Sequence, residues 1–293
     1  MSFKPVELSD RTAYDRFFQE CGTRASDYGF VNVWGWAEEH DLEIRFEPDC
    51  VLIRQGGENP VCWAPVGNWE KMDWNDVFAR LGAEGELVFT RVPENLLEIW
   101  RSIPQLRLEA AEQRGHWDYI YRVEDLISLK GNKLHKKKNL VNQFMNQYPY
   151  EYAALDTQDI RMAMDLQTEW CDWKDCESDE ELMAENNVIE KIFTRFGEFG
   201  DELMAGAVFV EGQMAGYTIA QELSADTVLI HFEKGNAAYK GIYQALNKLF
   251  LEHQAAGYRF VNRESDLDNP GLRKAKLSYR PVDFVKKYSV TVF

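Results

Sequence analysis

The sequence lacks any long hydrophobic run. No apolar stretch of its 293 residues approaches the roughly 20 residues that a membrane-spanning helix needs. Its N-terminus, MSFKPVELSDRTAYDRFF, carries charge early and has no apolar core of the kind found in secretory signal peptides. We therefore predict a cytoplasmic protein without a transmembrane segment.

Cysteine is scarce as well. The chain has five cysteines, an odd and scattered set: Cys21, Cys50, Cys62, Cys171 and Cys176. In a cytoplasmic chain of this size, such a set predicts no disulfide framework. The four residues between the last two fit neither a zinc knuckle nor a redox pair, so no metal site is predicted.

Positive charge is in deficit. The 33 Lys and Arg residues stand against 49 Asp and Glu residues, which gives a formal charge of −16. Such an acidic surface disfavours non-specific binding to nucleic acid or to anionic lipid. The basic residues gather in two blocks, 130–138 and 273–287, so a polyanion has to bind at these local patches.

Several catalytic fingerprints are also missing. The sequence shows no Ser-His-Asp order, no P-loop, no HExxH motif and no dinucleotide-binding glycine pattern. What it does have is 45% hydrophobic and 13% aromatic residues, enough for ordinary cores in one large domain or two smaller ones. The function therefore has to be sought in less standard motifs.

The pattern of elements indicates two domains. Helices alternate with short strand-like runs such as LEIRFE and CVLIRQ as far as about residue 122, and the alternation restarts at about residue 124. We predict an N-terminal domain at 1–123 and a C-terminal domain at 124–293 that carries the site.

The second half has the clearer order. It begins with helices, the first a basic one at 132–147, and continues with three strands, MAGAVFV, MAGYTIAQEL and TVLIHFEKG. A helix at 239–256 with a regular apolar stripe then precedes the strand YRFVNRE and a terminal strand. This is the element order of the GNAT (N-acetyltransferase) fold, and the first half is a looser version of it. We predict an α/β (α+β) protein of two tandem GNAT-like domains, each a mixed, mostly antiparallel sheet flanked by helices.

In that fold, the loop before the 239–256 helix is the place for a phosphate group. Backbone N–H groups and the dipole at a helix N-terminus favour an anion such as the pyrophosphate of coenzyme A. The run Lys240-Gly241-Ile242-Tyr243 keeps only the first glycine of the usual pattern, and Tyr243 stands where a small residue is expected. A glycine at this position is explained equally well if Gly241 only allows the backbone to begin the helix.

A dense charge cluster follows the strand YRFVN. Glu264 and Asp266 are candidate general bases, because burial can raise the pKa of a carboxyl beside an arginine. Structural salt bridging is the alternative explanation. A candidate anion grip comprises Arg263, Arg273, Lys274, Lys276 and Tyr279.

The basic helix offers a second anion-binding candidate. Lys133, Lys136 and Lys137 can contact an RNA backbone or a nucleotide phosphate, although a plain solvated helix face explains them as well.

These motifs together resemble a bacterial family named for its similarity to the C-terminal domain of phosphatidylglycerol lysyltransferase. The resemblance spans almost the whole chain. It is carried by DYGFVN with Trp34, by GNKLHKKKN, HFEK and GIYQALN, and by the block from Asn262 to Pro281.

The resemblance implies tandem GNAT-like domains, as in transferases that take an aminoacyl group from tRNA. An amine or hydroxyl then attacks an aminoacyl ester, with Glu264 or Asp266 as base and the cations around them as the grip on the leaving tRNA. The donor is aminoacyl-tRNA or acyl-coenzyme A, with no cofactor certain, and the acceptor is a small molecule or a lipid headgroup. A non-catalytic GNAT-fold protein that binds an anionic metabolite or nucleotide is the alternative.

Overall fold

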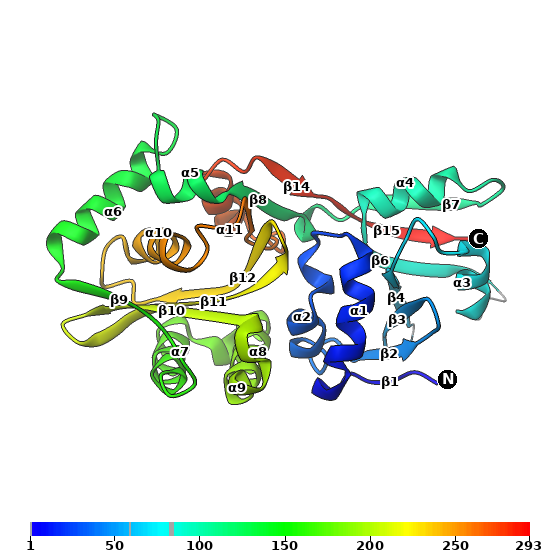
Figure 1. Ribbon diagram of the computed structural model, residues 1–293, viewed down its shortest axis with the longest axis horizontal. Coiled ribbons are helices and arrows are strands. Elements are labelled where there is room, and N and C mark those ends of the chain that lie inside the picture. The colour runs from blue at the N-terminus through cyan, green and yellow to red at the C-terminus, as the bar shows by residue number, and fades with distance from the viewer. Residues whose placement is uncertain (1, 59, 82–84) are drawn as a thin grey trace. The chain divides into compact units, whose positions relative to one another are not determined.

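The computed structural model describes residues 2–58, 60–81 and 85–293, which form two compact units (Figure 1). Unit 1 comprises Met1–Asp118, Ser265–Asn269 and Phe284–Phe293, and unit 2 comprises Tyr119–Glu264 and Pro270–Asp283. Two short segments near the C-terminus therefore belong to unit 1. The predicted domain boundary falls at the first residue of α5 (Val123–Ser128).

Unit 1 is built on a mixed sheet. Its strand order is β1-β2-β3-β4-β6-β15-β7, with β5 paired to β3. The strands are β1 (Lys4–Pro5), β2 (Leu42–Phe46), β3 (Cys50–Gln55), β4 (Val61–Trp63), β5 (Val66–Gly67), β6 (Leu87–Pro93), β7 (Leu108–Glu112) and β15 (Lys287–Val292). The helices are α1 (Arg11–Cys21), α2 (Phe30–Gly35), α3 (Trp74–Arg80) and α4 (Glu94–Ser102).

The last strand of the chain completes this sheet. β15 lies between β6 and β7 and is antiparallel to both, with Val290 opposite Phe89 and Ala110. A strand that seemed to close the second half of the sequence therefore belongs to unit 1.

A second mixed sheet has the strand order β14-β8-β13-β12-β11-β10-β9. Its strands are β8 (Asp118–Arg122), β9 (Tyr150–Ala154), β10 (Leu203–Val210), β11 (Gln213–Ser224), β12 (Thr227–Gly235), β13 (Phe260–Asn262) and β14 (Asp283–Val285). With α5, the helices of unit 2 are α6 (His135–Gln147), α7 (Ile160–Lys174), α8 (Glu180–Thr194), α9 (Phe196–Phe199), α10 (Ile242–Gln254) and α11 (Pro270–Leu277).

Unit 2 has the predicted GNAT-like order. β10, β11 and β12 form an antiparallel meander, α10 follows, and β13 then pairs in parallel with β12. α10 lies on one face of the sheet with α5 and α6 beside it, and α7 and α8 cover the other face (Figure 1). The apolar stripe of α10 explains its position, because Ile242, Ala245 and Leu246 pack with Val208 and Phe144 in the core.

The structure bears on two expectations from the sequence, one about membrane-spanning helices and one about disulfides. Among the residues that the structure describes, no helix is long and apolar enough to cross a membrane. The expectation about disulfides was wrong in one place, because the sulfurs of Cys171 and Cys176 are bonded. Cys171 lies in the last turn of α7 and Cys176 begins the next short helical turn, so the chain reversal brings them together.

Candidate functional site

The site in unit 2 begins where two parallel strands separate. The ladder between β12 and β13 covers only three pairs and ends at Leu229 and Asn262, whereas β12 continues to Gly235. After Asn262 the chain separates from β12, although Arg263 and Glu264 still form backbone hydrogen bonds with Tyr119 of β8, and Glu264 adopts a left-handed backbone with φ of 52°. In open sheets, ligands bind beyond the carboxyl ends of parallel strands, which is the position of this divergence.

A bulge in β12 directs a histidine toward this divergence. Ile219 of β11 pairs with Phe232 and Ala220 pairs with Ile230, which leaves His231 as an extra residue in β12. Bulges re-aim side chains and occur often beside active sites. The buried His231 ring has Nδ1 3.2 Å from Oε1 of Glu264 and Nε2 2.9 Å from Oε1 of Gln221.

Arg263 is the central cation of the site, and 15% of its side chain is exposed. Its guanidinium forms an ion pair with Glu233, whose other carboxylate oxygen accepts a hydrogen bond from the Asn247 side chain at 2.9 Å. Burial alone lowers the pKa of Arg263, but Glu233 outweighs it and raises that pKa, so the group stays charged. Its Nη1 is buried and has no well-aligned hydrogen-bond acceptor among the residues that the structure describes, and the Tyr279 hydroxyl interacts with the same guanidinium.

Aromatic and basic groups surround this guanidinium. The Tyr279 ring lies 4.9 Å from Cζ of Arg263, and Nζ of Lys137 on α6 lies 4.1 Å from the same ring. Burial, followed by the charge of Arg263, lowers the pKa of Lys137. Nζ of Lys276 donates to the backbone carbonyl of Arg263 at 2.5 Å.

The structure therefore brings together several of the residues predicted from the sequence. Arg263, Glu264, Lys276, Tyr279 and Lys137 converge in unit 2. Four further residues lie with them that were not predicted from the sequence: His231, Glu233, Gln221 and Asn247. A bulge or an isolated buried amide leaves no local sequence signal, although HFEK was noted as a motif.

Asp266, the other predicted base, lies in unit 1. It is fully buried, forms a 3.1 Å ion pair with Arg114 and accepts a hydrogen bond from the backbone N–H of Asp268 at 3.0 Å. These contacts are those of a carboxylate that holds a turn, whereas the Glu264 side chain remains one quarter exposed.

The loop before α10 differs from an open phosphate cradle. Gly241 has φ of 93°, and a Cβ atom there would collide with the backbone carbonyl of Leu140 on α6. The Tyr243 hydroxyl donates to the carbonyl of Gly235 at 2.9 Å and accepts from the indole of Trp170 at 3.1 Å. The side chain at the unexpected position therefore forms part of the packing between α10 and α7.

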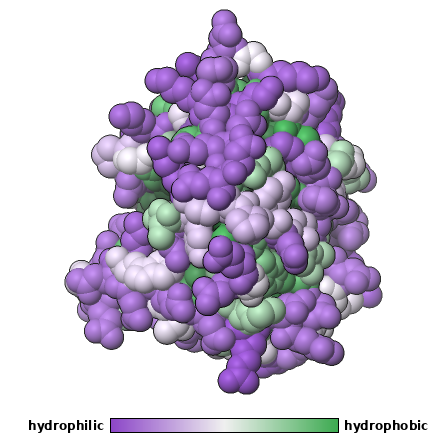
Figure 2. Space-filling model, turned by 90° about the vertical axis from the view of Figure 1, so that its left-hand side faces the viewer, coloured by the Kyte–Doolittle hydropathy of each residue, from purple (hydrophilic) through white to green (hydrophobic). Residues whose placement is uncertain are grey.

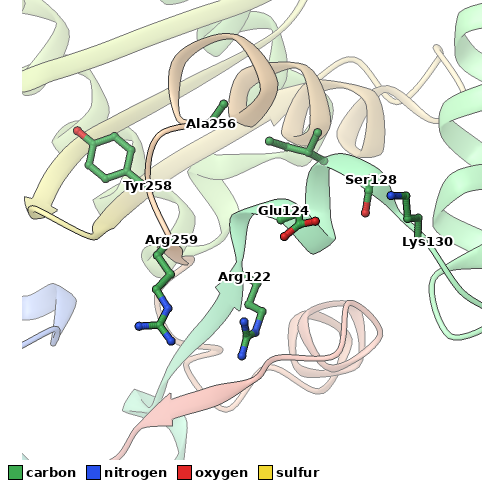
Figure 3. Close-up of a pocket in the computed structure, with 8 residues that line it drawn as sticks. Arg122, Glu124, Ser128, Lys130, Ala256, Tyr258 and Arg259 are labelled. Atoms are coloured by element: carbon green, nitrogen blue, oxygen red, sulfur yellow. The ribbon is translucent and has the colours of Figure 1, made fainter.

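The remaining predicted cations lie on the surface of unit 2. Lys274 is on the exposed side of α11 and Arg273 is half-buried on the same helix. Lys133 lies just before α6, and Lys136 lies in its first turn. Lys240 lies in the loop before α10 and is exposed. A separate open hollow of about 510 Å³ is lined by Arg122, Lys130 and Arg259 together with Glu124 and Tyr258 (Figure 3).

Unit 1 contains a second buried charge cluster. Nζ of Lys287 forms ion pairs with Asp27 and, at 2.7 Å, with Asp118, and Arg91 contacts Asp27 at 2.6 Å. Burial alone raises the pKa of Asp27, but Lys287 and Arg91 outweigh it and lower that pKa. Burial raises the pKa of Asp118 more than Lys287 lowers it. Every charge here faces an opposite charge inside the unit.

Solved structures and a curated sequence resemble this chain. A conserved protein of unknown function from Bacteroides thetaiotaomicron is 30% identical, with full coverage of both chains and a TM-score of 0.91. The structure of L-PGS from Bacillus licheniformis is 14% identical over 99% of this chain and 93% of that one, with a TM-score of 0.65, which shows a shared fold. An uncharacterized protein of Mycoplasmoides gallisepticum is 25% identical over 60% of this chain, and the match spans 56% of that protein.

A family model agrees with these likenesses and matches residues 18–291, nearly the whole chain. The fold predicted from the sequence and the resemblance noted there are both confirmed. The chain belongs to the family described as phosphatidylglycerol lysyltransferase, C-terminal.

Proposed function

We propose that this protein transfers an aminoacyl group from aminoacyl-tRNA to an amine or hydroxyl acceptor at the site where β12 and β13 separate. Membership of a transferase family supports acyl transfer in general. The observation that carries the proposal is Arg263, a charged and largely buried side chain whose Nη1 lacks a well-aligned acceptor among the described residues and which precedes the partly exposed Glu264 in the sequence. An unsatisfied buried donor is costly to a fold, and a ligand oxygen removes that cost.

The residues suit the chemistry of an ester donor. The acceptor's nitrogen or oxygen attacks the ester carbonyl, its proton passes to Glu264, and the open N–H of Arg263 stabilises the negative charge on the carbonyl oxygen. The bond from the carbonyl carbon to the ribose oxygen then breaks, and the leaving oxygen takes the proton that Glu264 holds. Glu233 and Asn247 keep the Arg263 guanidinium in position throughout.

The loop before α10 supports tRNA over coenzyme A as the donor. A pyrophosphate at a helix N-terminus needs backbone N–H groups that the ligand can approach closely. Gly241 instead packs against Leu140 of α6, and the N–H groups of Ile242, Gln244 and Ala245 already donate to carbonyls of Tyr239 and Gly241.

The distribution of charge in unit 2 also supports a polyanionic donor. Residues 126–150 contain five lysines and no acidic residue, and residues 234–251 and 269–282 are equally free of Asp and Glu. These segments meet, because Gly241 packs on α6 and Lys137 contacts Tyr279. The face of unit 2 that carries α6 shows mostly hydrophilic side chains, with white and green, less polar ones among them (Figure 2). In a chain of charge −16, such segments provide the local positive patch that a tRNA backbone needs.

A transfer assay with two donors tests the proposal. The full chain is incubated with radiolabelled bulk aminoacyl-tRNA or with acetyl-coenzyme A, together with amine, hydroxyl and lipid acceptors, and labelled products are separated from donor. We expect transfer from aminoacyl-tRNA, reduced about 100-fold or more in Arg263→Met and in Glu264→Gln. The matched control is Arg122→Met, because Arg122 is an exposed arginine of the same unit outside the site.

Three results contradict the proposal in different ways. Transfer from acetyl-coenzyme A alone overturns the donor, and full activity in both site variants overturns the site. Binding of tRNA or a nucleotide without any transfer, lost in Arg263→Met and kept in Glu264→Gln, supports the alternative of a non-catalytic binding protein.

A further inference from the structure

The hollow of about 510 Å³ in unit 2 lies at the start of β13, whereas the site where β12 and β13 separate begins after β13 ends. Arg122, the last residue of β8, pairs with Phe260 of β13, and Arg259 directly precedes that strand. Its other walls come from α5, the residues after it and the turn after α10. Small-molecule sites have volumes of roughly 300–1,000 Å³, and this hollow falls within that range. None of its lining residues belongs to the site described above.

Three cations line this hollow without an opposite charge bound to them. Arg122, Lys130 and Arg259 are exposed, and none of them forms an ion pair with another residue that the structure describes. Glu124 lines the same hollow and forms no ion pair within the described part of the chain either. Like charges around one hollow repel one another, and an anion bound among them replaces that repulsion by attraction. A concave surface lined mainly by one sign of charge also concentrates counter-ions.

Hydrogen-bonded backbone holds the two arginines of the hollow. The N–H of Val123 donates to the carbonyl of Arg259 at 3.2 Å, and the N–H of Arg259 donates to the carbonyl of Asp226 at 3.0 Å. Cζ of Arg259 lies 4.8 Å from the centre of the Phe260 ring. The side chains of Arg122 and Arg259 extend in the same direction from neighbouring segments (Figure 3). A ligand therefore does not have to order the backbone on binding, which lowers the cost of association.

We propose that this hollow binds a small phosphate ester that also carries hydroxyl groups. Its three cations contact the phosphate, because a guanidinium offers a fork of donors to phosphate oxygens and a lysine adds a point charge. Glu124 accepts a hydrogen bond from a hydroxyl of the same ligand, since an ionised carboxylate is an acceptor only. This inference goes beyond the proposed transfer reaction and does not depend on it.

The composition of the hollow favours such an ester over other anions. A phosphate monoester carries about two negative charges near pH 7 and three acceptor oxygens, which suits three cations better than a single carboxylate does. A nucleic acid backbone needs a continuous run of positive charge, but here the exposed Glu124 and Asp125 follow Arg122 in the sequence. Glu124 repels a bare phosphate ion, whereas a ligand with an O–H group gives this carboxylate a hydrogen-bond partner.

Isothermal titration calorimetry on the full chain tests the proposal. The probes are ribose 5-phosphate, adenosine monophosphate, inorganic phosphate and ribose. We expect both esters to bind about tenfold or more tightly than inorganic phosphate, because a hydrogen bond to the charged Glu124 adds to the phosphate contacts, and we expect no binding of ribose. Lys130→Met/Arg259→Met should weaken ester binding at least about tenfold. Glu124→Ala should bind inorganic phosphate more tightly than the parent and lose the preference for the esters.

The control removes the same two kinds of charge elsewhere in unit 2. Lys138 and Arg161 are exposed, lie outside the hollow and have no ion pair with a described residue. Lys138→Met/Arg161→Met therefore changes the net charge by the same amount and should bind the esters as the parent does. Thermal melts without ligand check that all variants fold.

The two esters also distinguish the source of the phosphate. Tighter binding of adenosine monophosphate supports a nucleotide, and equal binding of the two supports a sugar phosphate. Equal affinity for inorganic phosphate and the esters overturns the proposal, as does full ester binding in Lys130→Met/Arg259→Met. Binding of bulk tRNA but of neither ester, lost in that variant, means a polyanion surface and overturns it too. A failure of the transfer assay leaves this test unaffected, since the titration contains no aminoacyl donor or acceptor.

Discussion

The two units each bury a cluster of charged residues, and the clusters differ in one respect. In unit 1, Lys287, Arg91, Asp27 and Asp118 face one another inside the unit. In unit 2, Arg263 faces Glu233 but is 15% exposed and Glu264 is 25% exposed, whereas the side chains of Lys287, Asp27 and Asp118 in unit 1 are at most 5% exposed. A buried cluster whose charges are matched specifies a fold, whereas a charged guanidinium and a carboxylate that solvent can reach indicate a ligand site.

The strongest test of this comparison removes the central cation of unit 1. Lys287→Met leaves two buried aspartates without their shared partner, and we expect a loss of about 3–5 kcal/mol in the free energy of unfolding. Urea denaturation measures it. Lys286→Met is the control, because the neighbouring Lys286 forms an exposed pair with Glu94 and should change stability little. A Lys287→Met protein as stable as the parent would show that this cluster does not hold unit 1 together.

Removing the disulfide tests how much the packing of α7 contributes to the stability of unit 2. Cys171 follows Trp170, whose indole holds the Tyr243 hydroxyl, so the bond fixes the end of α7 near the site. Closing a loop of this length contributes about 2 kcal/mol through the unfolded chain. In urea denaturation, the free energy of unfolding of Cys171→Ser/Cys176→Ser should be about 2 kcal/mol lower than that of the parent. Dithiothreitol should lower the stability of the parent by the same amount and leave the double variant unchanged. Equal sensitivity of the double variant to dithiothreitol contradicts this.

Acid titration separates the two aspartates of unit 1. The pKa of Asp27 is lower in the folded protein than its value of 3.8 in the unfolded chain. The ionised Asp27 therefore stabilises the folded protein fully above pH 3.8, and this stabilisation is lost as the pH falls from 3.8 toward the folded-state pKa. The raised pKa of Asp118 acts in the opposite direction and partly offsets the loss. In Asp27→Asn, we expect the dependence of unfolding free energy on pH below about 4 to become shallower, by up to about 1.4 kcal/mol per pH unit. A steeper dependence contradicts the assignment.

The comparison also shows what the sequence could predict. The apolar stripe predicted a helix at 239–256, and α10 occupies Ile242–Gln254, because a helix that packs on a sheet carries its pattern locally. The insertion of β15 between β6 and β7 has no local signal, since strand partners are chosen by distant residues. Lys287 ended the basic block 273–287 that was expected to be open to a polyanion, but its position in the sheet buries it.

The same reasoning explains the outcome at the site. We predicted Arg263, Glu264 and Lys276 because their charges cluster within a short segment, and Tyr279 because it lies in the same segment. His231 is separated from Glu264 by 33 positions and reaches it through a bulge that shifts the register of β12 by one residue. Periodicity cannot show that shift, because a single inserted residue turns a side chain to the other face of a strand.

His231 provides the smallest and most selective test of the difference between the units. In unit 2 its ring contacts Glu264 and Gln221, so we infer a positioning role that acts on turnover. His231→Phe keeps the ring volume and removes both nitrogens, and we expect kcat to fall about tenfold with KM nearly unchanged, as for loss of one orienting hydrogen bond. His231→Gln, which keeps one polar contact to Glu264, should restore part of the rate. The control His253→Phe alters an exposed histidine that stacks on Tyr152 in the same unit, and it should leave the rate unchanged. If His231→Phe instead lowers stability and leaves kcat intact, this cluster is structural like that of unit 1, and the contrast between the two units disappears.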